Sequence, residues 1–140
     1  MASRLNPYLT FDGNAREAME TYKDIFGGEL SVNTFGDLGA AQDESMADKV
    51  MHSMLETPAG FTLMASDSPP GMPFQPGNTI SVSLSGDDED DLRGYWEKLS
   101  GGGQVTMPFE EQMWGDVFGM CVDRFGVPWM VDVVRQTQPA

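Results

Sequence analysis

The sequence predicts an α+β fold made of two copies of one supersecondary unit, because two of its segments recur further along the chain. A stretch that begins at Gly13 and contains Tyr22 has an echo that begins at Gly86 and contains Tyr95. One such unit is too small to bury its own sheet face, so we expect the halves to form a single domain with a cavity where they meet. The second echo pairs Gly60-Phe61-Thr62-Leu63-Met64 with Gly126-Val127-Pro128-Trp129-Met130.

The first half is expected to contain a strand, a helix and then three strands. Residues 5–11 form the first strand, which ends at Asp12-Gly13. Asn14 is suited to cap the helix, and Gly27-Gly28 are suited to stop it. The helix has apolar residues at helical spacing, namely Ala18, Met19, Tyr22, Ile25 and Phe26. The later strands fall at about 29–35, 49–57 and 61–67.

The second half repeats this order, which gives two βαβββ modules. A strand at 78–85 leads into a helix at 88–100, whose apolar residues Leu92, Tyr95, Trp96 and Leu99 share one face. Three strands follow at about 104–109, 116–123 and 127–134. We therefore expect one domain over 1–140, with module 1 at about 1–67, a proline- and glycine-rich linker at 68–77, and module 2 at about 78–135.

A long polar segment at 36–48 has no counterpart in the second half. Loops of this length are lids or mobile connections, and the sequence does not choose between these roles.

The acidic run at 87–91 stands at a helix start, where capping and the helix dipole favour carboxylates. Its spacing lacks the glycine and the terminal glutamate of a calcium-binding loop, so we expect no ion site there.

Charge excludes two classes of partner. The chain carries 22 acidic and 8 basic side chains, a net charge of −14, so it is repelled by nucleic-acid phosphates and anionic lipid surfaces. It begins with no apolar signal core and has no apolar run long enough to span a membrane. Its single cysteine, Cys121, lies in an apolar alternating run and is expected to be a small buried hydrophobe. These features predict a cytoplasmic protein.

Several motifs resemble the PhnB-like branch of the glyoxalase/bleomycin-resistance/dioxygenase (vicinal oxygen chelate) superfamily, over nearly the whole chain. The resemblance implies an eight-stranded cup formed by the two modules, with the helices outside, and a homodimer. The residues that carry it are Leu5 to Gly28, Met51-His52, Leu63-Met64-Ala65-Ser66-Asp67, Gly102-Gly103-Gln104-Val105-Thr106-Met107-Pro108, Trp114-Gly115, Phe118-Gly119 and Asp123 to Val131.

The resemblance also implies a divalent metal, held by His, Gln or Glu from the first and last strands of each module. In this chain those positions fall at or next to Pro7, Met64, Ile80 and Met130, and none offers a nitrogen or oxygen donor. A thioether suits neither zinc nor magnesium, iron or manganese. A slip of one residue would select Asn6, Tyr8 or Thr79, which still make a poor site. We therefore expect no metal and no other cofactor.

His52, the only histidine, is the candidate for chemistry. It lies in an alternating strand and shares a face with Met54, where it could act as a base or as a hydrogen-bond donor. Its other interpretation is a half-buried strand histidine satisfied by a neighbour. Asp67 and Asp132 follow apolar strand residues and could orient such a base, although carboxylates at strand ends usually meet solvent.

Two functions of different class follow. The first is metal-free binding of a small, largely apolar molecule in the cup, with His52 as a polar anchor beside Met54 and Trp114 on a mobile rim; the walls are Met64, Phe118, Met120 and Met130. The second is a lyase, isomerase or dioxygenase-type enzyme that uses His52 or an undetected metal site. Methyltransferases are also associated with PhnB-like chains, but the sequence has no cofactor motif for that reaction.

The helices predict a homodimer as well. Their faces carry more aromatic surface than thin helices over a single sheet usually cover, from Tyr22, Phe26, Tyr95, Trp96 and Leu99. Because the net charge opposes self-association, such an interface would have to bury enough apolar area to outweigh the repulsion.

Overall fold

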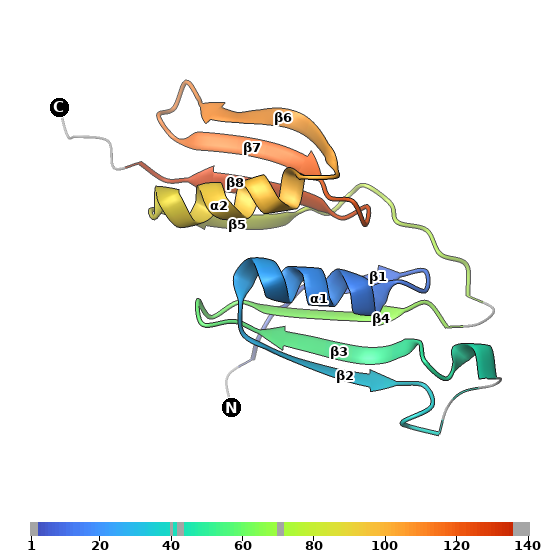
Figure 1. The fold of residues 1–140 in the computed structure, drawn as a ribbon. Coiled ribbons are helices and arrows are strands. Elements are labelled where there is room, and N and C mark those ends of the chain that lie inside the picture. Colours follow the sequence, from blue (N-terminus) through green and yellow to red (C-terminus); the bar gives the residue numbers. More distant parts are fainter. Residues whose placement is uncertain (1–2, 40, 42–43, 70–71, 136–140) are drawn as a thin grey trace. The chain divides into compact units, whose positions relative to one another are not determined.

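A computed structural model of the chain describes residues 3–39, 41, 44–69 and 72–135 and confirms the repeated βαβββ order (Figure 1). The chain divides into two compact units, Met1–Gln75 and Pro76–Ala140, which we call module 1 and module 2. Module 1 contains β1 (Tyr8–Phe11), α1 (Ala15–Phe26), β2 (Glu29–Thr34), a short 3₁₀ turn (Glu44–Met46), β3 (Val50–Glu56) and β4 (Thr62–Asp67). Module 2 contains β5 (Val82–Gly86), α2 (Glu89–Ser100), β6 (Gln104–Glu111), β7 (Val117–Val122) and β8 (Pro128–Val133).

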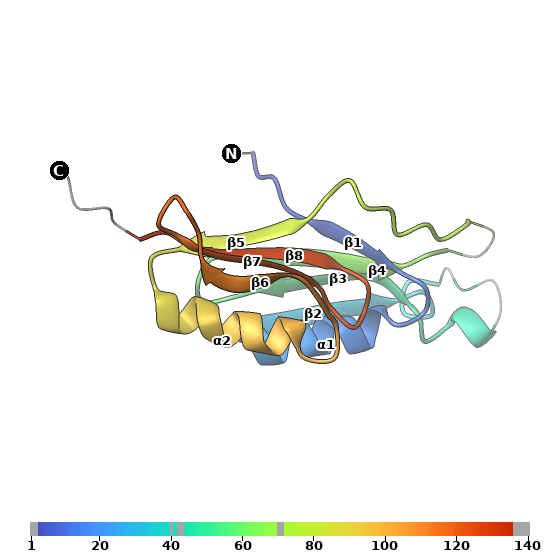
Figure 2. The same cartoon turned by 90° about the horizontal axis from the view of Figure 1, so that it is seen from above.

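Each module holds one four-stranded mixed sheet. The strand orders are β1-β4-β3-β2 and β5-β8-β7-β6. In both sheets the first strand pairs in parallel with the last, and the other neighbours are antiparallel. A helix connects the two outer strands, and it lies along one face of its own sheet (Figure 2). The α+β class predicted from the sequence is therefore confirmed.

The first strands begin later than the sequence predicts. β1 starts at Tyr8 because Pro7 has no N–H to contribute to the ladder, although its carbonyl oxygen still accepts from the Met64 N–H at 3.1 Å. β5 starts at Val82, opposite Trp129, because its partner β8 itself begins at Pro128. Ile80 therefore precedes the strand and is 79% exposed.

The alternation of each strand places one set of side chains under the helix. Leu9, Ala65 and Ser53 lie side by side across β1, β4 and β3, and the last two are fully buried. In module 2 the same layer contains Trp129 and Cys121, which face each other across β8 and β7. Period-two alternation leaves the intervening residues on the opposite face. We call that opposite side the helix-free face of each sheet.

The close packing of α2 depends on Gly119. A Cβ atom built there would lie 2.8 Å from Phe109 Cα and 3.0 Å from the Trp96 ring, closer than side chains can approach. The absence of that atom lets the Trp96 and Phe109 rings stack with centroids 5.2 Å apart. This glycine thus fixes α2 against β6 and β7.

Asp67 ties α1 to the sheet. It is 2% exposed, and its Oδ1 accepts from the Ala15 N–H at 2.9 Å while its Oδ2 accepts from the Val50 N–H at 2.8 Å. The expected side-chain cap at Asn14 is wrong, because the Asn14 side chain makes no capping hydrogen bond. Asp67 therefore neither meets solvent nor lies beside His52, since its carboxylate points under the helix.

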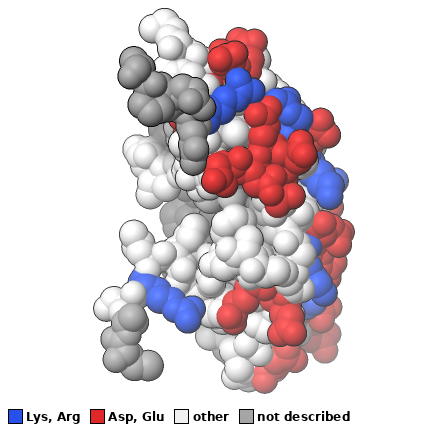
Figure 3. All heavy atoms as spheres, turned by 90° about the vertical axis from the view of Figure 1, so that its left-hand side faces the viewer, with Lys and Arg blue, Asp and Glu red and all other residues white. Residues whose placement is uncertain are grey.

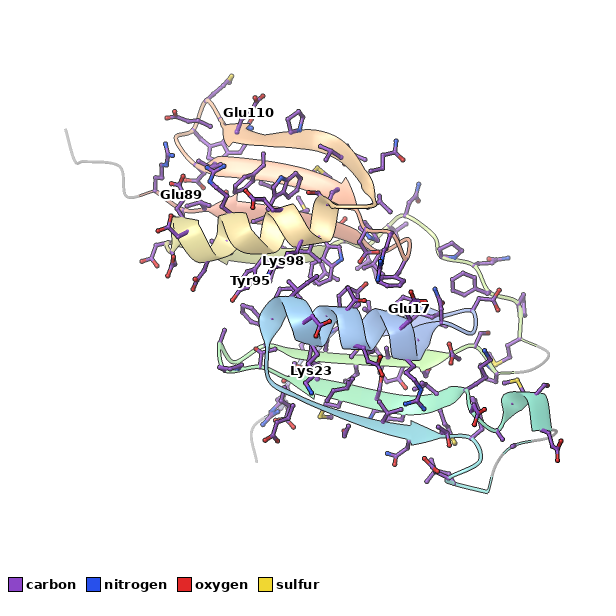
Figure 4. All side chains as sticks on the ribbon, viewed as in Figure 1. Glu17, Lys23, Glu89, Tyr95, Lys98 and Glu110 are labelled. Atoms are coloured by element: carbon purple, nitrogen blue, oxygen red, sulfur yellow. The ribbon has the colours of Figure 1, made fainter. Side chains whose placement is uncertain are left out.

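The acidic run of module 2 caps α2, as predicted. Asp88 accepts from the Asp91 N–H at 3.1 Å, and Glu89 pairs with Arg93 at 3.0 Å and with Arg135 at 3.1 Å. Hydrogen bonds from these two arginines lower the pKa of Glu89. Figure 4 shows Glu89 near the start of α2 and Lys98 near its end, the arrangement that the helix dipole favours.

The hairpin turns of the two modules match residue for residue. Thr57 N–H donates to Phe61 O at 3.0 Å, and Asp123 N–H donates to Val127 O at 2.9 Å. Gly60 and Gly126 both adopt φ of +91°, a conformation that favours glycine. The second echo of the sequence therefore encodes two equivalent turns.

Burial bears on two other expectations. Cys121 is 1% exposed, and burial raises the pKa of its thiol to about 11, so it is the small buried hydrophobe that was predicted. Of the helix residues used to predict a dimer, Tyr22, Phe26, Trp96 and Leu99 are buried within the chain itself and give no surface for a partner. The homodimer stays a prediction.

Within the described residues no helix is long and apolar enough to cross a membrane.

Replacing Asp67 with alanine is expected to lower the free energy of unfolding by about 2 to 6 kcal/mol, because two buried N–H groups lose their acceptors at about 1 to 3 kcal/mol each. Urea denaturation followed by circular dichroism measures this change. Ser66→Ala is the matched control, because Ser66 lies next in the same strand on the helix-free face, and it should change stability by less than about 0.5 kcal/mol. Equal effects of the two substitutions would contradict the anchoring role.

Candidate functional site

The helix-free face of module 1 carries an apolar row across its sheet. Tyr8 pairs with Met64, Met64 pairs with Met54, and Met54 pairs with Ser31. Both methionines are half-buried although no helix covers them. Thioether side chains are flexible and polarisable, so they can adapt to ligands of varied shape. The face therefore offers an adaptable apolar strip.

His52 and Tyr8 meet beside this strip. The Tyr8 hydroxyl lies 3.4 Å from His52 Nδ1, and the two rings stack with centroids 5.9 Å apart. His52 is half-buried, whereas Tyr8 is 48% exposed. Among the described residues His52 Nε2 has no hydrogen-bond partner, so this nitrogen is available to another molecule.

A polar pocket of about 280 Å³ lies at the other end of the same sheet. It combines a cationic side chain, Arg4, with an anionic one, Glu56, near the β3–β4 turn. Glu56 pairs with Thr62, and each lies two residues along its strand from the Met54–Met64 pair. The complete lining is Arg4, Asn6, Glu56, Thr57, Gly60, Phe61 and Thr62.

The helix-free face of module 2 repeats the methionine row. Met130 pairs with Met120, Met120 pairs with Met107, and Ser83 stands opposite Met130 on β5. Met120 and Met130 are half-buried. Met54 and Met64 have the same positions in module 1, at a constant separation of 66 residues, so the apolar pair is a shared feature of the modules.

An aromatic pair borders this second row. Phe118 faces Asp132 across β7 and β8, and the Trp114 ring from the β6–β7 turn lies 6.1 Å from the Phe118 ring. Trp114 is 57% exposed and Phe118 is half-buried.

Asp132 is an acidic residue of this face, next to Phe118. Its Oδ1 atom is removed from solvent and has no hydrogen-bond partner among the described residues. Burial and the neighbouring Asp116 carboxylate raise the pKa of Asp132. Asp132 occupies in module 2 the position that Ser66 has in module 1, and Phe118 occupies that of His52.

The strand register shows which first-strand residues face Met64 and Met130. Tyr8 faces Met64, and Ser83 faces Met130, so Pro7 and Ile80 are not the residues opposite the methionines. Tyr8 and Ser83 are 75 residues apart, whereas the hairpin methionines are 66 apart. The difference arises in the connection between β2 and β3, residues 35–49, which is longer than the connection between β6 and β7, residues 112–116. The first strands, the helices and the strands that follow them begin 74 or 75 residues apart.

These residues do not fit a divalent metal of the kind found in the superfamily. The two thioethers face a phenol and a primary alcohol, which are weak ligands when protonated. Within the described part of the chain, no three His, Cys, Asp or Glu side chains gather in a group that could hold a metal ion. Acidic side chains gather instead on the surface, as the face in Figure 3 shows.

The predicted site residues thus fall into two groups on equivalent faces. Module 1 holds His52, Met54 and Met64, and module 2 holds Trp114, Phe118, Met120 and Met130. Sequence reasoning missed Tyr8 as the partner of His52, the pairing of Asp116 with Asp132, and the polar pocket. Alternation along residues 5–11 could have placed Tyr8 on the same side as Thr10, but no local signal reports contacts between strands so far apart in the sequence.

Comparison with known proteins identifies the family. The sequence model of the family described as 3-demethylubiquinone-9 3-methyltransferase matches residues 3–132. The chain therefore belongs to this PhnB-like family, as its motifs predicted. Protein YjdN of Escherichia coli is 30% identical, over 94% of this chain and 96% of YjdN.

Solved structures share the fold. Protein PA1353 from Pseudomonas aeruginosa is 39% identical with a TM-score of 0.83, over 94% of this chain and 97% of that one. A PhnB protein from Bacillus cereus, described as a putative 3-demethylubiquinone-9 3-methyltransferase, is 23% identical with a TM-score of 0.70 over 92% and 98% of the two chains. A glyoxylase/bleomycin resistance protein/dioxygenase domain from Frankia is 16% identical with a TM-score of 0.66 over 96% and 99%. The last two show the superfamily fold alone.

Asp132→Asn is expected to stabilise the protein more at about pH 7 than at about pH 4. The folded chain holds the Asp132 proton more tightly than the unfolded chain does, so stability is lost as the pH rises from the ordinary pKa of 3.8 through the raised folded value. An amide removes this loss, because it stays neutral and can still donate to Asp116. Urea denaturation at the two pH values measures the difference.

Asp24→Asn is the control for this experiment, since it makes the same change of charge at an exposed position on α1. It should show a smaller difference between the two pH values. If both variants respond equally to pH, the effect arises from net charge and the assignment to Asp132 is wrong.

Proposed function

We propose that this family member binds a small, largely apolar molecule on the helix-free faces of its sheets, without a metal. The observation that carries the proposal is the repeated pair of half-buried methionines, Met54 with Met64 and Met120 with Met130. In each module this pair occupies the middle strands of the sheet, and one member of it, Met64 or Met130, stands where relatives of this fold are expected to hold a metal ligand.

Energetics favour an apolar ligand there. Each square ångström of apolar surface removed from water contributes about 25 cal/mol, so covering two methionines and one aromatic ring stabilises a complex by a few kcal/mol. Trp114 and Phe118 add aromatic surface at the edge of the module 2 row. Ligand pockets combine such apolar walls with a few polar groups, and His52 with Tyr8 supplies one of these in module 1.

An enzyme is the alternative, and the Tyr8–His52 contact favours it. A histidine held by a neighbouring hydroxyl, with its second ring nitrogen free among the described residues, is a common arrangement for acid–base catalysis. A lyase or isomerase of this kind would act through His52. We do not propose methyl transfer, the reaction in the family's description, because the sequence contains no cofactor motif for it.

The neutral hydrophobic dye phenylnaphthylamine is expected to bind, with an increase in its fluorescence and a rise in the melting temperature of the protein. Met64→Glu and Met130→Glu should each weaken its binding at least about tenfold, because a carboxylate without a partner is costly to bury under an apolar ligand. Fluorescence titration gives the dissociation constants.

Met72→Glu is the matched control, because Met72 is 62% exposed and lies outside both sheets. It should leave the affinity unchanged. Equal affinities for all three variants would refute binding on the helix-free faces. A reaction that the wild type catalyses and His52→Ala abolishes would favour the enzyme instead.

Protein purified without chelator is expected to carry no stoichiometric transition metal, because the residues around Met64 and Met130 supply thioethers and hydroxyls. Elemental analysis by mass spectrometry tests this. About one equivalent of zinc, nickel, iron or manganese per chain, lost in Tyr8→Phe or Ser83→Ala, would contradict a metal-free site.

A further inference from the structure

The contact between Tyr8 and His52 determines which hydrogen-bonding group the histidine presents. His52 Nδ1 faces the phenol hydroxyl at 3.4 Å, and the stacked rings hold the imidazole in place. A phenol carries one O–H donor, and a neutral imidazole carries one acceptor nitrogen and one N–H. Because a phenol donates more strongly than it accepts, the favoured arrangement has Tyr8 O–H donating to Nδ1.

The proton of the neutral ring then resides on Nε2. This nitrogen has no partner among the described residues, and the histidine is half-buried on the helix-free face. Among the described residues Asp132 Oδ1 is the only buried side-chain nitrogen or oxygen atom without a partner, so His52 Nε2 is open to solvent and a bound molecule can reach it. His52 therefore presents a donor to a ligand that lies along Met54 and Met64.

We propose that module 1 selects apolar molecules that carry a neutral carbonyl oxygen, with His52 Nε2–H as the donor to that oxygen and Tyr8 as the positioning residue. This inference rests on the proposed binding function and names the class of ligand. His52 would contact the ligand directly, whereas Tyr8 would act through His52.

Charge favours a neutral carbonyl over a carboxylate. Glu56 lies on the same helix-free face as Met54, two residues along β3, and Glu29 pairs with it from β2. The whole chain carries a net charge of −14. Arg4 shares a pocket with Glu56 and offsets part of its charge, so the repulsion of an anion comes mainly from the net charge, which does not affect a ketone, an amide or an ester.

The internal repeat shows that the fold does not need a histidine here. His52 and Phe118 stand at equivalent positions, each two residues before the first methionine of its pair in the same strand. Module 2 thus forms the same sheet with a phenyl ring. His52→Phe copies that residue into module 1, so it removes the donor in a way that the fold already accommodates.

Two probes of the same shape test the preference. Acetonaphthone carries a ketone oxygen, and ethylnaphthalene has the same ring system without an acceptor. Wild-type protein is expected to bind the ketone about fivefold more tightly than the hydrocarbon, relative to their partition into an apolar solvent, as one neutral hydrogen bond provides. His52→Phe should abolish the preference and keep the affinity for ethylnaphthalene, and Tyr8→Phe should reduce it.

Failures of the two proposals give different results. If both probes bind wild type equally and His52→Phe changes neither, the carbonyl inference is wrong while apolar binding stands. If neither probe binds, both proposals are wrong. If naphthoate binds more tightly than acetonaphthone and loses this advantage in His52→Phe, the acceptor is anionic and the preference for a neutral carbonyl is refuted.

Nitrogen-15 NMR tests the role of Tyr8 without any ligand, and it needs no assignment because the chain has one histidine. At about pH 8 the wild type should show a pyrrole-type Nε2 signal and a pyridine-type Nδ1 signal displaced by hydrogen bonding. Tyr8→Phe should remove that displacement while circular dichroism stays unchanged. A pyrrole-type Nδ1 in the wild type would overturn the assigned tautomer.

Discussion

Each four-stranded sheet of this protein has a single helix, and one helix can cover only one face. The strands therefore alternate between residues buried under the helix and residues on the opposite side. In module 1 the first set includes Leu55 and Ala65, both fully buried, and the second includes Met54 and Met64. A soluble sheet with one open face normally places polar residues there. Paired methionines at those positions are the departure that our functional proposal explains.

The repeat divides the residues into two classes. The modules share the methionine pairs, and they share the turns at Gly60 and Gly126. They differ in polar residues, since His52 corresponds to Phe118 and Ser66 corresponds to Asp132. The shared class builds the fold and the apolar strip. We propose that the differing class gives each face its own ligand chemistry, as is expected when two copies of a unit diverge within one chain.

The sequence predicted the order of elements because helical spacing, strand alternation and glycine turns are local signals. It placed Met54, Met64, Met120 and Met130 on strands for the same reason. It did not predict that Asp67 anchors α1, because this carboxylate bonds to N–H groups 52 and 17 residues away. Tyr8 was missed as the partner of His52 across a separation of 44 residues. Ser83 rather than Ile80 lies opposite Met130, because the first-strand residues that face the methionines are 75 positions apart, whereas the helix tyrosines are 73 apart.

The most direct measurement of the central claim is an NMR titration of protein labelled at the methionine methyl groups, with phenylnaphthylamine as the probe. The eleven methionines sample the faces, the core and the connecting segments. Binding to the helix-free faces predicts that the signals of Met54, Met64, Met120 and Met130 move with the dye, while those of buried Met19 and exposed Met72 stay in place. Movement confined to Met19 or Met72, with the four paired methionines unchanged, would contradict it.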